Sequence, residues 1–307
     1  MKPLFSDKIT TNDKLVLLDD ETICDNDSKV AEIFKTFFSS AVSNLKIPYD
    51  KITYSISQQH DPVLHAIEKY KNHPSIKIIN KKMAKVCSFN FSHATIGDVI
   101  YEIKQLDLKK ASPKNSIPPR IIKENCDIFA HKILLDFNTS IDLGMFPDNL
   151  KYADIIPIYK KDDRLDKCNY RPVSILPSMS KIFERLIFRQ LNDYMDPKLS
   201  IYQCGFRKNM SAQNCLLFMV EKLKQCLDNK GSTGILLTDL SKAFDCLIHD
   251  LLLAKLHAYG FGYNAIKLIY SYLNGRFQRV CINSSYSSWA EILFGVAQGS
   301  ILGPILF

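Results

Sequence analysis

The chain has 307 residues, 46% hydrophobic and 23% charged, which excludes global disorder and allows a sizeable core in two domains or one lobed domain. Lys and Arg number 40 against 32 Asp and Glu, and the net charge of +8 permits a polyanionic partner without establishing one. The nine cysteines are scattered and include no C-x-x-C pair, which argues against a disulfide framework or a zinc site and favours free thiols.

The N-terminal stretch MKPLFSDKITTNDK has no apolar leader, and nowhere do about 18 apolar residues follow one another. We therefore expect an intracellular protein, cytoplasmic or nuclear, without a membrane partner. The segment DSKVAEIFKTFFSSAVSNL places apolar side chains from Val30 to Leu45 on one helical stripe, with Asp27 positioned as the cap. The weak, polar pattern from Pro48 to about Lys85 predicts a loop or connector.

Further helices and a pair of strands follow along the middle of the chain. ATIGDVIYEIKQLDLKKA is amphipathic and predicts a helix, and SPKNSIPPRII predicts a proline-broken loop. The next helix runs through DIFAHKILLDFNTSIDLG, with Gly144 as its C-terminal cap. KYADIIPIYKKDDRLDKCNYRPVSIL then predicts a strand, a charged turn and a second strand, and MSKIFERLIFRQLNDYM predicts a helix.

The C-terminal part alternates short strands with helices. QCGFRKNMSAQN predicts a loop before a helix from about Ala212 to Leu227. In KGSTGILLTDLSKAFD we expect residues 235–237 to form an apolar strand with Asp239 at its exit. Helices are expected through LLLAKLHAYGF and AIKLIYSYLNG, and RFQRVCINSSYSSWAEILF predicts a hairpin with NSSYSS as its turn. The fold class is α+β, with short strands among many helices.

Taken alone, the polar motifs leave two interpretations open. A carboxylate at a strand exit, such as Asp239, suits Mg²⁺, but an aspartate there also caps turns, and spacing alone favours the cap. Asp245 is typical of a helix cap or a surface group. The run KKDDRLDKCNYR is either a solvated loop or a grip for a triphosphate or a nucleic-acid backbone. From the residues alone, Phe244 is typical of a core residue, and Arg171 is typical of a surface residue that pairs with Asp166.

Four blocks, taken in order, resemble the reverse transcriptases of non-LTR (LINE-type, jockey-like) retrotransposons. They span residues 150–307: IIPIYKKDDRLDKCNYRPVSILPSMSKIFERLI, YQCGFRKNMSAQN, LLTDLSKAFDCLIHDLLLAKL and GVAQGSILGPILF. VAEIFKTFFSSAV and VIYEIKQLDLKKASPKNSIPPRII also look like the segment that joins endonuclease to polymerase in such elements. The resemblance implies a mainly helical connector over residues 1–110, and the fingers and partial palm of a right-hand polymerase over residues 111–307.

The resemblance also implies roles for residues around the third block. Asp239 matches the first metal-binding aspartate of the palm, and the Leu240 backbone carbonyl is expected to join it on Mg²⁺. Phe244 matches the aromatic steric gate that lies under the incoming sugar and rejects a 2′-hydroxyl. Arg207 falls in a fingers loop that is expected to contact the template or the nucleotide.

Other matched residues are expected to surround the incoming nucleotide. Arg171, together with Lys160 or Lys161, matches the finger residues that hold the dNTP triphosphate. Gln298 and Gly299 match the loop that packs near the nucleotide and the template. Fixed cations of this kind offset the charge of a triphosphate during nucleotidyl transfer.

Two features depart from the family pattern. KKASPKNSIPP differs from the usual Gly-Pro-Asp-Gly style loop, and Ala297 stands where proline is usual. The second acidic motif of the family, an aromatic-x-Asp-Asp hairpin, is expected downstream of GPILF, and the 307 residues contain no such motif. We therefore expect a chain truncated within the palm, without the thumb, in which the family's two Mg²⁺ ions are not assembled and which is inactive alone.

The implied parent activity is RNA-directed DNA synthesis, the transfer of a nucleotide from a dNTP to a primer 3′-hydroxyl. It implies an RNA template, a DNA primer, an upstream endonuclease domain and a downstream palm and thumb in the parent polyprotein. Three alternatives stay open. They are a non-enzymatic nucleic-acid-binding remnant, a maturase-type reverse transcriptase of an intron, which also carries YRP, and a degenerate product without a role.

Overall fold

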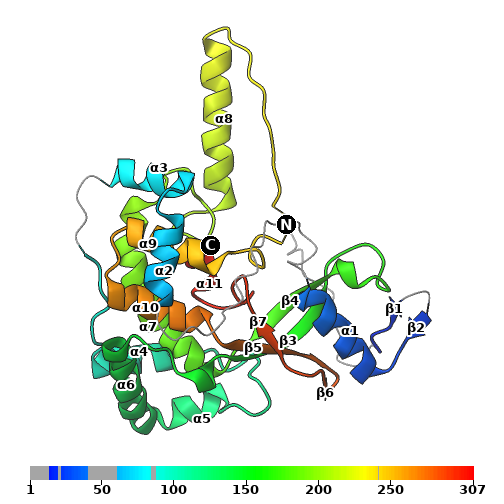
Figure 1. Ribbon diagram of the computed structural model, residues 1–307. Coiled ribbons are helices and arrows are strands. Elements are labelled where there is room, and N and C mark those ends of the chain that lie inside the picture. The colour runs from blue at the N-terminus through cyan, green and yellow to red at the C-terminus, as the bar shows by residue number, and fades with distance from the viewer. Residues whose placement is uncertain (1–13, 20–21, 41–60, 84–87, 241) are drawn as a thin grey trace.

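A computed structural model describes residues 14–19, 22–40, 61–83, 88–240 and 242–307. It confirms the α+β class: helices gather on one side of the molecule and a sheet lies on the other, while one long helix projects away (Figure 1). In the described part, no helix is long and apolar enough to cross a membrane. All eight cysteines in this part are free thiols, as the sequence predicts.

The central sheet has the strand order β4-β3-β5-β6, with β7 also paired to β5. Strand β3 (Tyr152–Tyr159) runs antiparallel to β4 (Tyr170–Ile175), which confirms the predicted strand–turn–strand unit. On its other side β3 runs parallel to β5 (Arg276–Ile282). Strands β6 (Ser285–Tyr286) and β7 (Ala290–Ile292) both pair antiparallel to β5 and confirm the predicted hairpin.

The turn of this hairpin is tighter than NSSYSS. Only Asn283 and Ser284 connect β5 to β6, and both have positive φ angles of 46° and 71°. Such a two-residue turn matches the twist of the paired strands and tolerates polar residues such as Asn. A tight turn of this kind fixes the register between the two strands, Cys281 lying opposite Tyr286.

One continuous apolar core lies among the helices. The helices that build it are α2 (Pro62–Tyr70), α4 (Ile96–Lys104), α6 (Cys126–Leu143), α7 (Ser178–Met195), α9 (His249–Ala258) and α10 (Tyr263–Leu273). Val63 and Val99 belong to the same cluster as Leu253 and Ile266. The core therefore contains residues from both sides of the predicted boundary at residue 110. The division into a connector and a polymerase part stays a prediction from the family resemblance.

Short helical elements lie between or after the longer ones, and η2 (Lys167–Asn169) lies in the turn between β3 and β4. The others are α3 (Pro74–Lys82), α5 (Pro119–Glu124), α11 (Gly303–Leu306), η1 (Asp148–Leu150) and η3 (Asp196–Lys198). Helix α6 ends at Gly144, whose φ of 62° confirms the predicted left-handed cap. The predicted helices through α4, α7, α9 and α10 are likewise confirmed.

The prediction of a loop or connector from Pro48 to Lys85 is wrong where α2 and α3 lie. Both are nine-residue helices that begin with a proline after a capping side chain, Asp61 for α2 and His73 for α3. Each buries only two residues, so the apolar stripe is too short to stand out in the sequence. Both helices pack against α9, and this contact stabilises them although the local apolar pattern is weak. Residues 41–60 and 84–87 of that prediction lie outside the described residues.

The N-terminal part covers the sheet. Helix α1 (Asp27–Ser39) buries Val30, Ala31 and Phe34 in a second apolar cluster with Ile155 of β3 and Val280 of β5. Beside it lies a two-stranded hairpin of β1 (Leu17–Asp19) and β2 (Thr22–Cys24).

The start of α1 differs by one residue from the prediction. Its cap is Asn26, whose side chain accepts hydrogen bonds from the backbone N–H groups of Ser28 and Lys29, and Asp27 is the first helical residue. The end of the predicted helix, residues 41–45, lies outside the described residues.

The predicted strand at residues 235–237 is wrong. Residues 231–240 form an extended segment without regular structure that runs back beside the projecting helix α8 (Ala212–Asp228), as Figure 1 shows. Leu236 is 88% exposed and Leu237 is 84% exposed. An apolar run becomes a strand only when another strand pairs with its backbone, and among the described residues none pairs with this segment.

Candidate functional site

Three segments far apart in the sequence meet beside the central sheet. They are the turn at residues 242–246 with the start of α9, strand β4, and the loop at residues 295–302. The Gln298 side-chain amide donates a hydrogen bond to Asp245 at 2.8 Å, and the Gln298 backbone carbonyl accepts one from the Ser174 N–H at 2.7 Å. Gln298 is therefore held by both of the other segments.

Two backbone hydrogen bonds join the start of the 295–302 loop to the turn and the residue after it. The Val296 N–H donates to the Phe244 carbonyl at 2.9 Å, and the Gly295 N–H donates to the Leu247 carbonyl at 2.8 Å. His249 closes the contact, because its Nε2 lies 2.7 Å from the Gly295 carbonyl oxygen, which only accepts. Nε2 thus carries the proton, and burial lowers the pKa of His249 and favours this neutral form.

Two glycines allow this close packing. Gly295 has a φ of 76°, and a Cβ there would lie 2.5 Å from the Phe244 carbonyl oxygen. Gly299 has a φ of 113°, and a Cβ there would lie 2.9 Å from the Ser174 carbonyl oxygen. Both positions need the left-handed backbone and the missing side chain of glycine.

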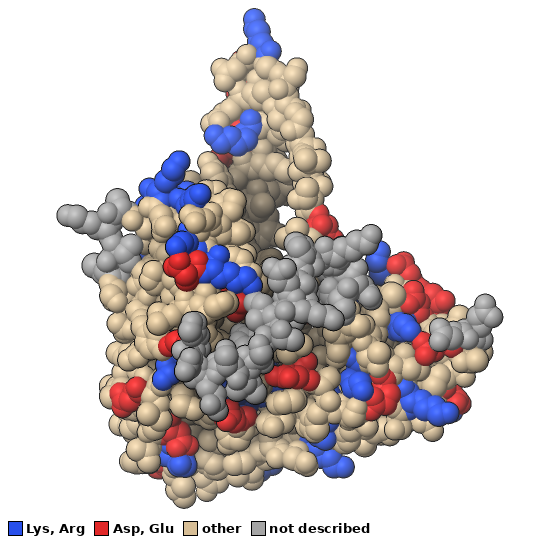
Figure 2. Space-filling model, in the orientation of Figure 1, with Lys and Arg blue, Asp and Glu red and all other residues tan. Residues whose placement is uncertain are grey.

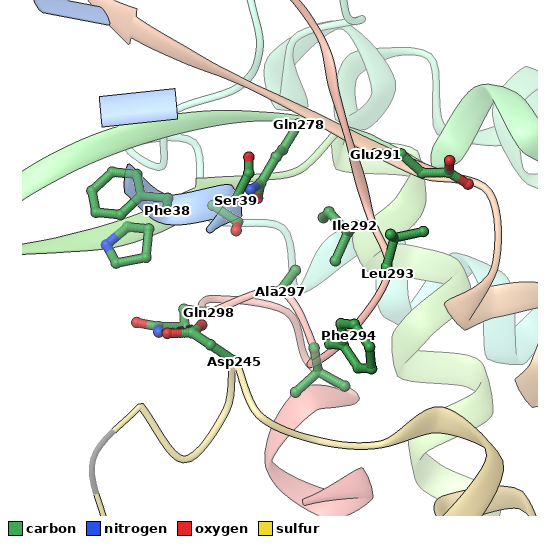
Figure 3. A pocket seen from close by; sticks show the side chains of 13 residues that line it. Phe38, Ser39, Asp245, Gln278, Glu291, Ile292, Leu293, Phe294, Ala297 and Gln298 are labelled. Atoms are coloured by element: carbon green, nitrogen blue, oxygen red, sulfur yellow. Dashed lines mark hydrogen bonds between the residues drawn. The ribbon is translucent and has the colours of Figure 1, made fainter. Parts of the chain in front are cut away.

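A cavity of about 340 Å³ opens between these segments, α1 and β7. Figure 3 shows Asp245 and Gln298 side by side at its floor, with Phe38 of α1 opposite them. Apolar side chains from residues 292–297 form much of the wall, and Pro172 and Ser174 of β4 line it too. A largely apolar cavity with a few convergent polar groups is the usual form of a small-molecule site.

Two acidic residues, Asp245 and Glu291, line this cavity, and Asp245 is the one that is bonded to Gln298. Burial raises the pKa of Asp245, against the opposing effects of the Gln298 hydrogen bond and of Lys242. The prediction of a helix cap or surface group at Asp245 is wrong, because its carboxylate faces Gln298 inside the cavity. Its place in the matched block, directly after Phe244, is the only sequence signal for it.

The expected triphosphate-binding residues lie on the hairpin of β3 and β4. Lys160 and Lys161 directly follow β3, and Arg171 lies on β4 opposite Ile158; all three are exposed. Arg171 precedes Pro172, which lines the cavity. Among the described ion pairs none includes Arg171, so the alternative pairing with Asp166 is not formed. Lys161 pairs with Asp162 at 3.4 Å.

Phe244 lies at the junction of the turn and the helical core. Its ring packs edge-on against Phe206, with ring centroids 5.8 Å apart, and at a tilt against Phe307, 5.1 Å away. The side chain is half-buried, so the core interpretation is correct as far as packing goes. Its backbone carbonyl accepts a hydrogen bond from the 295–302 loop, while the ring packs toward the helical core and is not among the described residues that line the cavity.

Arg207 is engaged within its own loop. Its Nε donates to Asp196 at 2.9 Å and its Nη1 donates to the Ser200 carbonyl at 2.9 Å. Only 14% of the side chain is exposed. These bonds tie the 196–207 loop together and leave little of the guanidinium for a template, so the expected contact gains no support from the geometry.

Asp239 and Leu240 do not join the cavity residues. Both are exposed in the extended segment, outside any paired strand. In the part of the chain that the structure describes, no group of three or more His, Cys, Asp or Glu side chains is arranged to hold a metal. A lone aspartate with a backbone carbonyl does not fit a site for two Mg²⁺ ions.

Comparison with known proteins places these motifs in a family. Residues 158–307 match the family described as reverse transcriptase (RNA-dependent DNA polymerase). The chain is 34% identical over 223 residues to the RNA-directed DNA polymerase from mobile element jockey of Drosophila melanogaster, covering 72% of this chain and 24% of that protein. A probable RNA-directed DNA polymerase from transposon X-element of the same fly is 37% identical over 183 residues, 57% of this chain and 20% of that protein.

A more distant relative comes from an intron. The putative COX1/OXI3 intron 1 protein of Saccharomyces cerevisiae is 30% identical over 140 residues, 46% of this chain and 16% of that protein. The chain thus spans a quarter or less of the length of these three relatives. It belongs to the reverse transcriptase family. Within that family it is a relative of the RNA-directed DNA polymerases of jockey-type, non-LTR mobile elements.

Proposed function

We propose that the chain is the fingers and the first part of the palm of an RNA-directed DNA polymerase, and that the cavity at Asp245 and Gln298 receives the incoming dNTP. One observation carries this proposal. The 2.8 Å hydrogen bond between Asp245 and Gln298 joins two family blocks on a cavity that a third block, through Pro172, also lines. Residues 111–307 are the polymerase part in this proposal, and residues 1–110 are its connector.

Charge and shape around the cavity support a nucleotide as ligand. Lys160, Lys161 and Arg171 are exposed cations on the adjoining hairpin, and all three are proposed to offset the charge of the triphosphate. Lys161 would exchange its ion pair with Asp162 for the phosphate, whereas neither Lys160 nor Arg171 takes part in a described ion pair. Phe244, next to Asp245 in the turn, is the proposed steric gate for the sugar, and the exposed Gly299, next to Gln298, is a proposed contact of the loop with the nucleotide. The other substrates in the proposal are an RNA template and a DNA primer, and Arg207 is the least supported of the expected contacts.

Basic side chains away from the cavity are compatible with a nucleic-acid partner. On the face shown in Figure 2, Lys and Arg gather over α3 and α8, while elsewhere they alternate with Asp and Glu. The last turn of α3 carries Lys81 and Lys82. The upstream endonuclease and the downstream palm and thumb, inferred from the family, are further parts of the proposed parent protein.

The metal chemistry of the family is not complete in the described residues. Reverse transcriptases use divalent metal ions, and Asp239 with the Leu240 carbonyl is the proposed first pair of Mg²⁺ ligands. Because these two groups stand alone on an exposed segment, we expect residues 1–307 to bind nucleotide without polymerising it.

Equilibrium binding of a fluorescent dTTP analogue tests the proposed site. Arg171→Ala is expected to weaken binding about tenfold, or about 1.4 kcal/mol, because it removes a charge-assisted contact to phosphate. Arg120→Ala is the matched control, since Arg120 is an exposed arginine paired with Glu124 on α5. Equal affinity in the wild-type chain and the Arg171 variant would contradict the proposed site.

A second function, nucleic-acid binding without catalysis, is favoured by the isolation of Asp239. Its signature is RNA binding whose affinity falls steeply with salt while dTTP has no measurable affinity. Titration of a single-stranded RNA at several salt concentrations, in parallel with the dTTP analogue, separates the two functions.

A further inference from the structure

A buried carboxylate on α7 binds the far end of the 295–302 loop. Glu184 has no exposed surface, and nothing in the proposed nucleotide site uses it directly. Its Oε2 accepts a hydrogen bond from the Ile301 N–H at 2.6 Å and a longer one from the Leu302 N–H at 3.4 Å. Burying a carboxylate costs free energy unless hydrogen bonds and opposite charges compensate it, so a buried Glu184 is expected to have a specific structural role.

The rest of the Glu184 environment holds the carboxylate in place. Ser180, one helical turn earlier, donates to Oε1 at 3.4 Å. Arg276, only 3% exposed, supplies the compensating positive charge, and Tyr272 lies alongside. The Arg276 guanidinium is itself fixed over the Tyr272 ring, 4.7 Å from its centroid, and donates to the Tyr272 carbonyl. One carboxylate oxygen of Glu184 therefore accepts a hydrogen bond from its own helix, and the other accepts hydrogen bonds from the loop.

The loop between its two anchors is short and internally bonded. Its start is fixed to the turn and α9 through Gly295, and its end is fixed to α7 through Ile301. Between them the Ser300 N–H and hydroxyl both donate to the Ala297 carbonyl, at 3.0 and 2.8 Å. Gln298 lies midway, so its position depends on both ends being held.

We propose that Glu184 is a positioning residue for Gln298: its buried carboxylate holds the 295–302 loop so that the Gln298 amide meets Asp245 across the cavity. Glu184 acts only through the loop backbone and touches no ligand. The anchoring follows from the geometry alone. Its consequence for nucleotide binding rests on the function proposed above.

Three variants of Glu184 separate anchoring from general stability. Leucine keeps the size and removes the acceptor; aspartate keeps the charge but withdraws the oxygens by about one bond length, ~1.5 Å; glutamine keeps one carbonyl oxygen within reach. Glu102→Gln is the matched control. Glu102 is a carboxylate on α4, only 4% exposed, that faces Arg185 and Arg189 and not the loop.

Amide hydrogen exchange, measured by mass spectrometry on the whole chain, is the first readout. We expect Glu184→Leu and Glu184→Asp to speed exchange in residues 295–302 at least tenfold, while peptides from α4 and from α1, which belongs to the separate apolar cluster at the sheet, keep their wild-type rates. Glu184→Gln is expected to change the loop less, and Glu102→Gln not at all. If Glu184→Leu does not fold, the aspartate variant decides. Wild-type loop exchange in that variant, or an equal rise throughout the chain, would overturn the proposal.

Ligand affinity is the second readout. The variant with the loosest loop is expected to bind the dTTP analogue at least fivefold more weakly and single-stranded RNA within twofold of wild type. Equal weakening for both ligands would overturn the specific role in nucleotide binding. If the wild-type chain binds no nucleotide, the function proposed above fails, and the exchange rates still decide whether Glu184 anchors the loop.

Discussion

Asp245 and Gln298 are 53 residues apart in the sequence, and their side chains meet in a 2.8 Å hydrogen bond on the floor of one cavity. The bond connects the turn after the exposed segment with the loop after β7. It matters for the fold as well as for the site, since the aspartate is half-buried and partial burial raises its pKa.

Replacing Gln298 by leucine is expected to lower the free energy of unfolding by about 1–3 kcal/mol, because it leaves the half-buried Asp245 carboxylate without its donor. Urea unfolding followed by circular dichroism measures the change. The double variant Gln298→Leu with Asp245→Asn is expected to recover part of the loss, since a neutral amide is less costly to bury. A double variant that is less stable than the wild type by the sum of the two separate effects would contradict this coupling.

Gly295→Ala is expected to cost about 2 kcal/mol or more. The new Cβ would lie 2.5 Å from the Phe244 carbonyl, at a φ of 76° that alanine rarely adopts. Gly205→Ala is the control, because a Cβ there would meet nothing within 4 Å and the residue is exposed. Thermal unfolding of both variants gives the comparison, and similar midpoints for the two would show that the loop accommodates the methyl group.

The stability of the chain is expected to depend on pH through Glu184. Burial raises its pKa above the ordinary value of 4.5, with Arg276 and the backbone N–H groups of Ile301 and Leu302 opposing the shift. A raised pKa means that the folded chain binds this proton more tightly than the unfolded chain. The stabilisation is therefore full below pH 4.5 and is lost as pH rises through the folded-state pKa.

Unfolding free energies measured in urea from pH 4 upward test this sign. Glu184→Gln should flatten the fall in stability with rising pH. Asp98 is the control of opposite sign, since hydrogen bonds from Thr95 lower its pKa, so its contribution is present at higher pH and lost as pH falls. Asp98→Asn should therefore alter the acid side of the profile and leave the fall attributed to Glu184 in place.

How far the sequence predicts this fold depends on where each segment finds its partners. The hairpin of β3 and β4 is predictable because apolar residues flank a short charged turn, so its pairing partner lies next to it along the chain. The helix α7 is predictable because its apolar stripe is long and unbroken. Helices α2 and α3 are not predictable from the local pattern, because each buries only two residues. They pack against α9, which comes more than a hundred residues later in the chain.

The candidate site shows the same dependence on distant contacts. Family blocks identify Gln298 and Phe244, but no spacing in the sequence reveals that Asp245 turns inward or that Glu184 binds the loop backbone, since both contacts join residues far apart along the chain. The apolar run at residues 235–237 looks like a strand by composition. It stays extended because, among the described residues, no other backbone pairs with it.

Residues 1–307 are expected to extend oligo(dT) on poly(rA) no faster than background when Mg²⁺ is present. Asp239 is exposed on an unpaired segment, and within the described residues no cluster of carboxylates is arranged to hold a metal there. Joining the chain to the palm and thumb of a jockey-type relative is expected to give measurable extension, because that part would supply a strand partner for residues 235–237 and the missing acidic ligands.

Asp239→Asn in the joined protein is then expected to abolish synthesis, since a neutral amide is a poor ligand for Mg²⁺. Asp228→Asn, an exposed carboxylate at the end of α8, is the matched control and should leave synthesis unchanged. Robust synthesis by residues 1–307 alone would show that the chemistry does not need a second group of carboxylates beside Asp239. Activity retained in the Asp239→Asn joined protein would show instead that this aspartate is not a metal ligand, and the alternative of a simple turn cap would stand.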